Sequence, residues 1–171
     1  LVGGLVRVNI SSFAATGDQQ FPHATALADG RIAIAWNTSN GYQIKTMVTD
    51  GATEAAQQTY TFTSNISSSF DGHIDIAQLS DGRLVTAWNS VVSDASGDIS
   101  WTYLDPTITG ASAPVNTFAI AGTNSEPMIA AGRAGRFVIV DTQTGTGTDV
   151  FRMQSVSGIG NAMFGSGELT G

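Results

Sequence analysis

The sequence predicts an all-β chain of three four-stranded antiparallel repeats, arranged like the blades of a β-propeller. One cassette recurs three times, and its turn glycines Gly30, Gly82 and Gly135 are separated by 52 and 53 positions. Runs of alternating apolar residues flank each of these glycines, and no stretch shows the 3.6-residue period of a helix. A period of about fifty residues indicates supersecondary units stacked on one another.

The three copies of the cassette each contain a predicted hairpin. They span Pro22–Trp36, Ile74–Trp88 and Pro127–Asp141. Asp-Gly between alternating apolar runs is a strong hairpin signal, and it predicts a two-residue turn with its glycine at positive φ. The third copy keeps the glycine and has Ala134 in place of the aspartate.

The second strand of each hairpin is predicted to lie at the centre of its sheet. In the first copy Ile32 and Ile34 alternate with Ala33 and Ala35, so both faces of the strand are apolar. Such a strand is covered on both sides. We therefore expect Trp36, and Trp88 at the same cassette position, to pack in the core.

Two further strands complete each repeat. The third strands are expected at 44–48, 99–103 and 150–154, and the weaker fourth strands at 60–62, 115–118 and 162–164. A strand of the fourth type also precedes the first cassette, because Phe13 and Gly17 recur as Phe118 and Gly122. The chain therefore reads as a leading strand followed by three complete units.

The predicted organisation is one domain over residues 1–171. It comprises the leading strand (1–21) and three repeats (22–73, 74–126 and 127–171). A β-trefoil, which closes with three repeats of this length, is the alternative. Three propeller blades do not close a ring, since propellers have four to eight. The propeller reading therefore predicts self-association, or pairing with other segments of a parent protein.

Composition excludes several classes of function. The formal net charge is -7, with 12% charged residues and Lys45 as the single lysine. This acidity disfavours nucleic acids as partners, and no apolar run is long enough for membrane insertion. The chain has no cysteine, so disulfides and thiolate-bound metals are excluded.

The cassette Pro-x-x-Ala-x-Leu-x-Asp-Gly-Arg-x-x-x-Ala-Trp resembles repeats of large secreted bacterial surface proteins and adhesins. These often carry hemolysin-type (RTX) calcium-binding segments. The match is good at 22–36 and 74–88, with flanking fits at Val115-Asn116 and Asp50-Gly51. The resemblance implies a non-enzymatic, extracellular role. The calcium nonapeptide itself is absent, so calcium binding is not implied by it.

The candidate ligand-binding residues lie on the third strands. Trp101 aligns with Thr46 and Arg152, which suggests a position that faces solvent. An exposed indole is a natural platform for a sugar ring or a partner protein. With Tyr103 on the same strand, Trp101 and Arg152 form the expected binding set.

One pair of carboxylates is a candidate calcium site. Asp94 and Asp98 supply two oxygen ligands from one loop, where calcium takes six to eight. Calcium is therefore a possible, weakly held ligand, and no other cofactor is expected.

The remaining polar residues are predicted to be structural. His23 and His73 show no metal spacing and no nucleophile motif, so they are expected to be non-catalytic. Asp29 and Asp81 are explained by their turns rather than by glycoside hydrolysis. We therefore expect an extracellular or cell-surface binding and assembly module of a surface protein, adhesin or virion appendage, and not an enzyme. A small carbohydrate-binding lectin with one site per repeat is the alternative.

Overall fold

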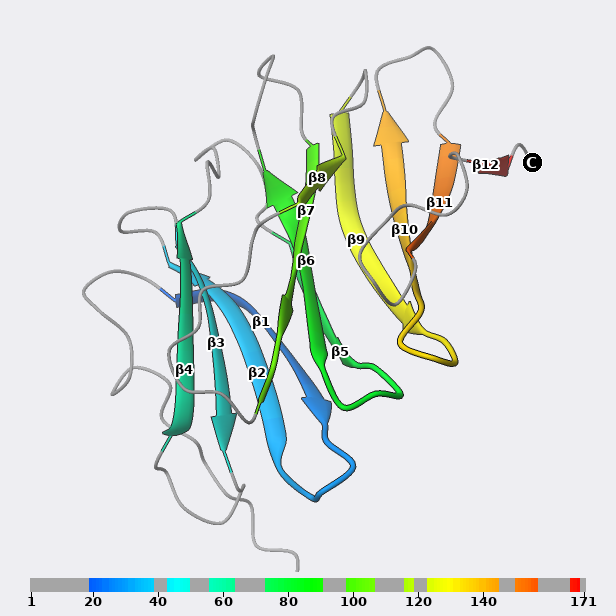
Figure 1. The fold of residues 1–171 in the computed structure, drawn as a ribbon. Helices are drawn as coiled ribbons and strands as arrows, with labels where there is room; N and C mark the ends of the chain where they lie inside the picture. Colours follow the sequence, from blue (N-terminus) through cyan, green and yellow to red (C-terminus); the bar gives the residue numbers. More distant parts are fainter. Residues whose placement is uncertain are drawn as a thin grey trace, which may run out of the picture.

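The computed structural model describes residues 19–38, 43–49, 56–63, 73–90, 98–106, 116–118, 123–144, 150–156 and 167–169. All regular elements in these ranges are strands, which form three antiparallel sheets of four strands (Figure 1). The first sheet contains β1 (Gln19–Ala26), β2 (Ile32–Thr38), β3 (Gln43–Thr49) and β4 (Ala56–Thr63). The second contains β5 (Ile74–Gln78), β6 (Leu84–Ser90), β7 (Asp98–Leu104) and β8 (Asn116–Phe118). The third contains β9 (Thr123–Ala131), β10 (Phe137–Thr144), β11 (Val150–Val156) and β12 (Gly167–Leu169).

Each sheet is a meander in which strands adjacent in sequence are hydrogen-bonded neighbours. The described strands pair only within their own sheet. They therefore do not close into the barrel that the trefoil alternative requires. The sheets stand side by side instead, and the first strand of the second sheet, β5, contacts both β1 and β9 (Figure 1).

Most of the expected strands are found where the sequence placed them. The second strands β2 and β6 are buried along nearly their whole length. This agrees with the prediction from the apolar residues on both of their faces. Trp36 and Trp88 are fully buried, which confirms their place in the core. Two expectations fall outside the described residues: most of the leading segment 1–21, and the fourth strand at 162–164. The last strand, β12, lies at Gly167–Leu169.

The first two hairpin loops are one residue longer than predicted. Leu27 and Arg31 close the first loop through a hydrogen bond of 2.8 Å from the Leu27 N–H to the Arg31 carbonyl, while the Gly30 N–H donates to the Leu27 carbonyl. The second loop repeats this pattern, with φ of 88° at Gly30 and 90° at Gly82. A turn followed by a left-handed glycine is the common three-residue hairpin connection. The need for glycine is confirmed, and the two-residue loop length was wrong.

The third hairpin has a different turn. The Arg136 N–H donates to the Arg133 carbonyl, and the two residues between them are both left-handed, with φ of 56° at Ala134 and 68° at Gly135. The Gly135 N–H is thereby released from the turn and donates to the Ser80 hydroxyl of the second sheet, at 3.0 Å. The replacement of aspartate by Ala134 thus accompanies a change of turn and a new contact between sheets.

The middle sheet is packed on both faces. Leu84 and Trp88 of β6 belong to a cluster shared with the first sheet, which includes Leu27, Ala33 and Ala35. Val85 and Ala87, which point the other way, belong to a second cluster with Phe137 and Ile139 of the third sheet. Alternation of side chains along β6 therefore places one core on each side of it.

No helix among the described residues is long and apolar enough to cross a membrane.

Candidate functional site

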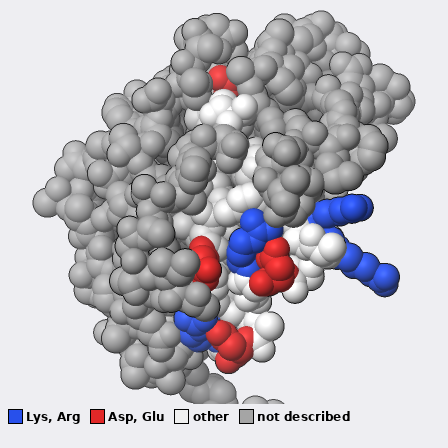
Figure 2. Space-filling view, viewed as in Figure 1, with Lys and Arg blue, Asp and Glu red and all other residues white. Residues whose placement is uncertain are grey.

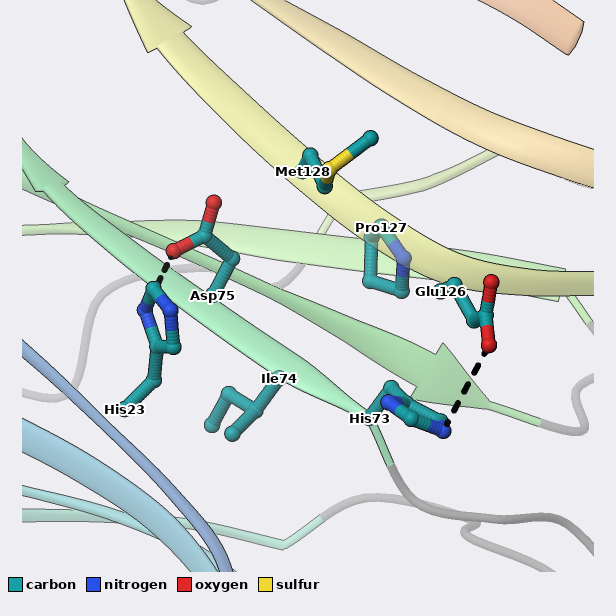
Figure 3. Close-up of a pocket in the computed structure, with 7 residues that line it drawn as sticks. All are labelled: His23, His73, Ile74, Asp75, Glu126, Pro127 and Met128. Carbon is teal, nitrogen blue, oxygen red and sulfur yellow. Dashed lines mark ion pairs between the residues drawn. The ribbon is translucent and has the colours of Figure 1, made fainter.

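The first strands of the three sheets bring polar side chains together in one pocket. His23 of β1, Asp75 of β5 and Met128 of β9 occupy the same position in their repeats, and His73 and Glu126 each lie two residues earlier. The pocket has a volume of about 260 Å³. Its lining residues are His23, His73, Ile74, Asp75, Glu126, Pro127 and Met128 (Figure 3).

Asp75 is the fixed point of this pocket. Its Oδ1 lies 2.6 Å from Nδ1 of His23 and accepts the N–H of Ile76 at 2.7 Å. Its Oδ2 accepts the N–H of Ile129, on the neighbouring sheet, at 2.6 Å. The carboxyl group is thus held by one group from each of three first strands, and its side chain is only 12% exposed.

Glu126 is the second carboxyl group and is much freer. Its Oε1 lies 4.0 Å from Nε2 of His73, and its side chain is 62% exposed. Figure 3 shows the His23–Asp75 pair and the His73–Glu126 pair at two separate places along the pocket. The pocket therefore holds one anchored and one accessible carboxyl group, each beside an imidazole.

Backbone irregularities occur at the pocket in two of the three first strands. Phe21 and Glu126 have φ of 51° and 55°, although each precedes a proline, which disfavours helical conformations. At each of them the pairing register shifts, between Gln20 and His23 on β1 and opposite Val140 to Thr142 on β9. Bulges of this kind re-aim side chains, and strained residues cluster at functional sites.

The rim of the pocket is apolar as well as acidic. Phe21 and Met128 are the large hydrophobic side chains that the described surface leaves exposed, and the Phe21 ring lies 5.3 Å from the His73 ring. An apolar surface beside carboxyl groups and imidazoles suits a ligand with both an apolar face and hydroxyl groups. Sugars have both.

The side chains expected to bind ligand lie elsewhere. Trp101 is 1% exposed and packs edge-on against Tyr103 and Phe137, so the expectation that it faces solvent was wrong. Phe137 comes from the third sheet, and its packing on Trp101 was not visible in the strand alignment. Tyr103 is half-buried beneath the Arg83 guanidinium, and burial raises the pKa of its hydroxyl group. Arg152 lies on β11 opposite Asp141, and its side chain is not described. A ligand-binding role for these three residues stays a prediction.

The calcium pair is only partly described. Asp98 is buried at the start of β7, while Asp94 lies outside the described residues. Among the side chains that are described, no group of three or more histidines and carboxylates is placed to hold a metal ion. Calcium binding by Asp94 and Asp98 stays a prediction.

Sequence reasoning missed the pocket, because it judged each histidine and aspartate by its local motif. The usable signal was the register of the repeats, which aligns His23, Asp75 and Met128 without a gap. Equivalent positions on the first strands of stacked sheets become neighbours in space. Polar residues at equivalent positions of the repeats can therefore line one pocket, even when they differ from one repeat to the next.

Comparison with known proteins finds solved structures that share the fold of this chain. No family model and no curated protein matches the chain. Solved structures of an α-L-arabinofuranosidase from Fusarium graminearum do match, with a TM-score of 0.64 and 10% identity. One of these is a mutant, and both contain an iminosugar inhibitor. A third structure, of an arabinofuranosidase from the same organism with arabinobiose, matches equally well.

These matches cover 88% to 90% of this chain and 48% to 49% of the enzyme. The chain therefore spans about half the length of the solved relatives. At this identity the likeness establishes a shared fold.

The likeness corrects the predicted class of function. The sequence indicated a non-enzymatic binding and assembly module, with a lectin as the alternative. The proteins that share its fold are instead enzymes named for acting on a glycoside. The expectation of a non-enzymatic role was made without the pocket between the sheets, which two carboxyl groups line.

Proposed function

We propose that the chain is part of a β-propeller glycoside hydrolase, and that its three sheets are consecutive blades of that propeller. The carbohydrate site is the pocket where β1, β5 and β9 meet. One observation carries this proposal: Asp75 and Glu126, on neighbouring first strands, line the same pocket. Hydrolysis of glycosides is commonly performed by two carboxyl groups on either side of the scissile bond.

The two carboxyl groups have different surroundings that suit different roles. Asp75 is fixed by three donors, so it is suited to a role that needs a constant position. Glu126 is exposed and can approach a bound sugar. In the reaction, water adds to the anomeric carbon and gives up a proton, the bond to the leaving oxygen breaks, and that oxygen takes up a proton. His23 holds Asp75 in place from 2.6 Å, and His73 lies 4.0 Å from Glu126, near enough to orient it.

The substrate class is proposed from the pocket and from the fold. Its volume of about 260 Å³ suits one or two sugar rings rather than a large aglycone. Because the enzymes with this fold are arabinofuranosidases, α-L-arabinofuranosides are the first substrates to test. An extracellular location, where plant and microbial polysaccharides are met, agrees with this role and with the resemblance to secreted repeat proteins.

The test is release of sugar from a panel of aryl glycosides and arabino-oligosaccharides by the wild-type protein and two variants. We expect Glu126→Gln and Asp75→Asn each to lower kcat/KM by about 10² to 10⁴, the contribution typical of a positioned acid or base. Glu126→Gln is the cleaner variant, since its exposed side chain supports no other described contact. Asp75→Asn also disturbs the bond to Ile129, so its melting temperature is measured alongside.

Asp29→Asn is the matched control, because Asp29 lies at the hairpin end of the first sheet rather than in the pocket. It should leave hydrolysis unchanged. Wild-type activity in folded Glu126→Gln would overturn the proposal, as would the absence of hydrolysis across the whole panel.

A further inference from the structure

The hairpins of the first two sheets carry an arginine that is neutralised within its own loop. Nη2 of Arg31 lies 2.7 Å from Oδ2 of Asp29, and Nη2 of Arg83 lies 2.7 Å from Oδ2 of Asp81. In both loops the aspartate also accepts the backbone N–H of the arginine. In each Asp-Gly-Arg loop the arginine and the aspartate therefore form an ion pair with each other.

The pairing is visible in the acid–base properties of these groups. Hydrogen bonds from Arg31 and Arg83 lower the pKa of Asp29 and Asp81. The hydrogen bond that Arg83 donates to Asp81 raises the pKa of Arg83 in return. The arginine at this repeat position therefore has a strong interaction with a carboxylate placed two residues earlier.

The third hairpin has the arginines and lacks the carboxylate. Arg136 stands at the repeat position of Arg31 and Arg83, while Ala134 stands at the position of their aspartates. Arg133 adds a second guanidinium where the other hairpins have Ala28 and Ser80. Both arginines are exposed. The ion pairs found among the described residues do not include either of them.

The surface around these arginines is open and hollowed. A depression of about 470 Å³ is lined by Gly132, Arg133, Ala134, Arg136, Phe137 and Val138. The Asp81 carboxylate lies against Gly135 of this loop and is already bound to Arg83. On the face in Figure 2, some basic groups lie against acidic groups, whereas others project with no acidic group beside them.

We propose that Arg133 and Arg136 form a binding site for the carboxylate of an acidic saccharide, a uronate residue of a polysaccharide. An external carboxylate takes the place that Asp29 and Asp81 fill in the other hairpins. Guanidinium groups bind carboxylates through paired N–H donors, which makes the site selective for this group over neutral sugars. Val138, which is half-buried beside these arginines, adds an apolar contact for the ring of the sugar.

The site is separate from the carboxyl pocket. Strand β9 runs from Thr123 to Ala131, with Glu126 near its start and the arginine hairpin just beyond its end. Seven residues of extended chain separate Glu126 from Arg133, or roughly 20 Å. The inference that a carboxylate binds here rests on the two arginines alone. The inference that a saccharide carries this carboxylate rests on the proposed function.

The binding test follows the side-chain Nε–H signals of arginine by NMR while trigalacturonate is added. The chain has six arginines, the seven basic residues less Lys45, so the spectrum is simple to assign. We expect the Arg133 and Arg136 signals to shift and those of Arg31 and Arg83 to stay in place. The fully methyl-esterified trimer, which has no charge, should bind at least ten times more weakly.

Two variants test the assignment from opposite directions. Arg133→Gln with Arg136→Gln should weaken trigalacturonate binding at least tenfold. Ala134→Asp should also weaken it, because it restores the internal carboxylate and aspartate tolerates a left-handed backbone. Arg31→Gln is the matched control and should bind like the wild-type protein.

Several outcomes would overturn the site. They are equal binding of the charged and esterified trimers, shifts confined to other arginines, or unchanged binding in the double variant. A hexaglutamate peptide that binds more tightly than trigalacturonate would overturn the saccharide assignment. Glu126→Gln should lose hydrolysis and keep trigalacturonate binding, so failure of the catalytic proposal and failure of this site are told apart.

Discussion

Ala134 holds a backbone conformation that is unfavourable for any residue with a Cβ atom. Its φ of 56° lies in the left-handed region, where an L-residue is disfavoured by about 1 to 2 kcal/mol. We expect Ala134→Gly to stabilise the protein by about 0.5 to 1 kcal/mol, since part of the gain is offset by the greater freedom of glycine in the unfolded chain. Urea denaturation measures the change. Ala130→Gly, in the exposed part of β9, should destabilise instead, and equal effects of the two changes would contradict the turn geometry.

Because of the Asp81–Arg83 pair, the stability of the folded protein is expected to decrease as the pH falls. The pKa of Asp81 is lowered by its hydrogen bond with Arg83, so the folded state favours the ionised carboxylate. The stabilisation is present above the unfolded-state value of 3.8 and is lost as pH falls below it. The pair is partly exposed, so its contribution is at most about 1 kcal/mol. Asp81→Asn should therefore be less stable than wild type at pH 7 and nearly equal to it near pH 2.5. A difference that grows on acidification would contradict this account.

At the scale of elements, contact between hairpins holds neighbouring sheets in register. The Gly135 N–H donates to Ser80, and a Cβ on Gly135 would collide with the Asp81 carboxylate. Gly30 also has positive φ, but a Cβ there meets no described atom. Gly30→Ala should therefore cost about 1 to 2 kcal/mol, the price of the backbone conformation alone. Gly135→Ala should cost clearly more, and equal losses in thermal unfolding would show that the contact between sheets is unimportant.

The strands could be predicted because their signals are local. Period-two alternation, a glycine at each turn and apolar residues on both faces of Ile32–Trp36 depend on neighbours in the sequence. The loop length was wrong because Asp-Gly fits both a two-residue turn and a turn followed by a left-handed glycine. The third turn differs again, since Gly135 donates to Ser80 of another sheet.

The candidate site could not be predicted in the same way, because it exists only between sheets. Asp75 is explained locally as an ordinary strand residue, and its bonds to His23 and Ile129 come from the neighbouring sheets. Trp101 was placed on the surface for the same reason, since Phe137 covers it from the third sheet. The arrangement of sheets decides both cases, and no short motif carries that information.

At the scale of the whole molecule, the chain spans about half the length of the solved enzymes that share its fold. In the proposed propeller, the outer faces of the three-sheet stack are surfaces against which further blades pack. Self-association, or pairing with other segments of a parent protein, stays a prediction. Sedimentation over a range of concentrations measures it, and a mass of one chain at every concentration would contradict it.

The central claim is that the pocket between β1, β5 and β9 binds the sugar that is cleaved. The chain has two histidines, His23 and His73, and both line this pocket. Their imidazole signals in NMR therefore report on it without interference from other sites. The decisive measurement is a titration with an arabinose-configured iminosugar, the class of inhibitor bound by the enzymes with this fold. We expect both imidazole signals to shift and saturate together in the wild-type protein, and the affinity to fall at least tenfold in Glu126→Gln. Unchanged imidazole signals at millimolar iminosugar would contradict the claim.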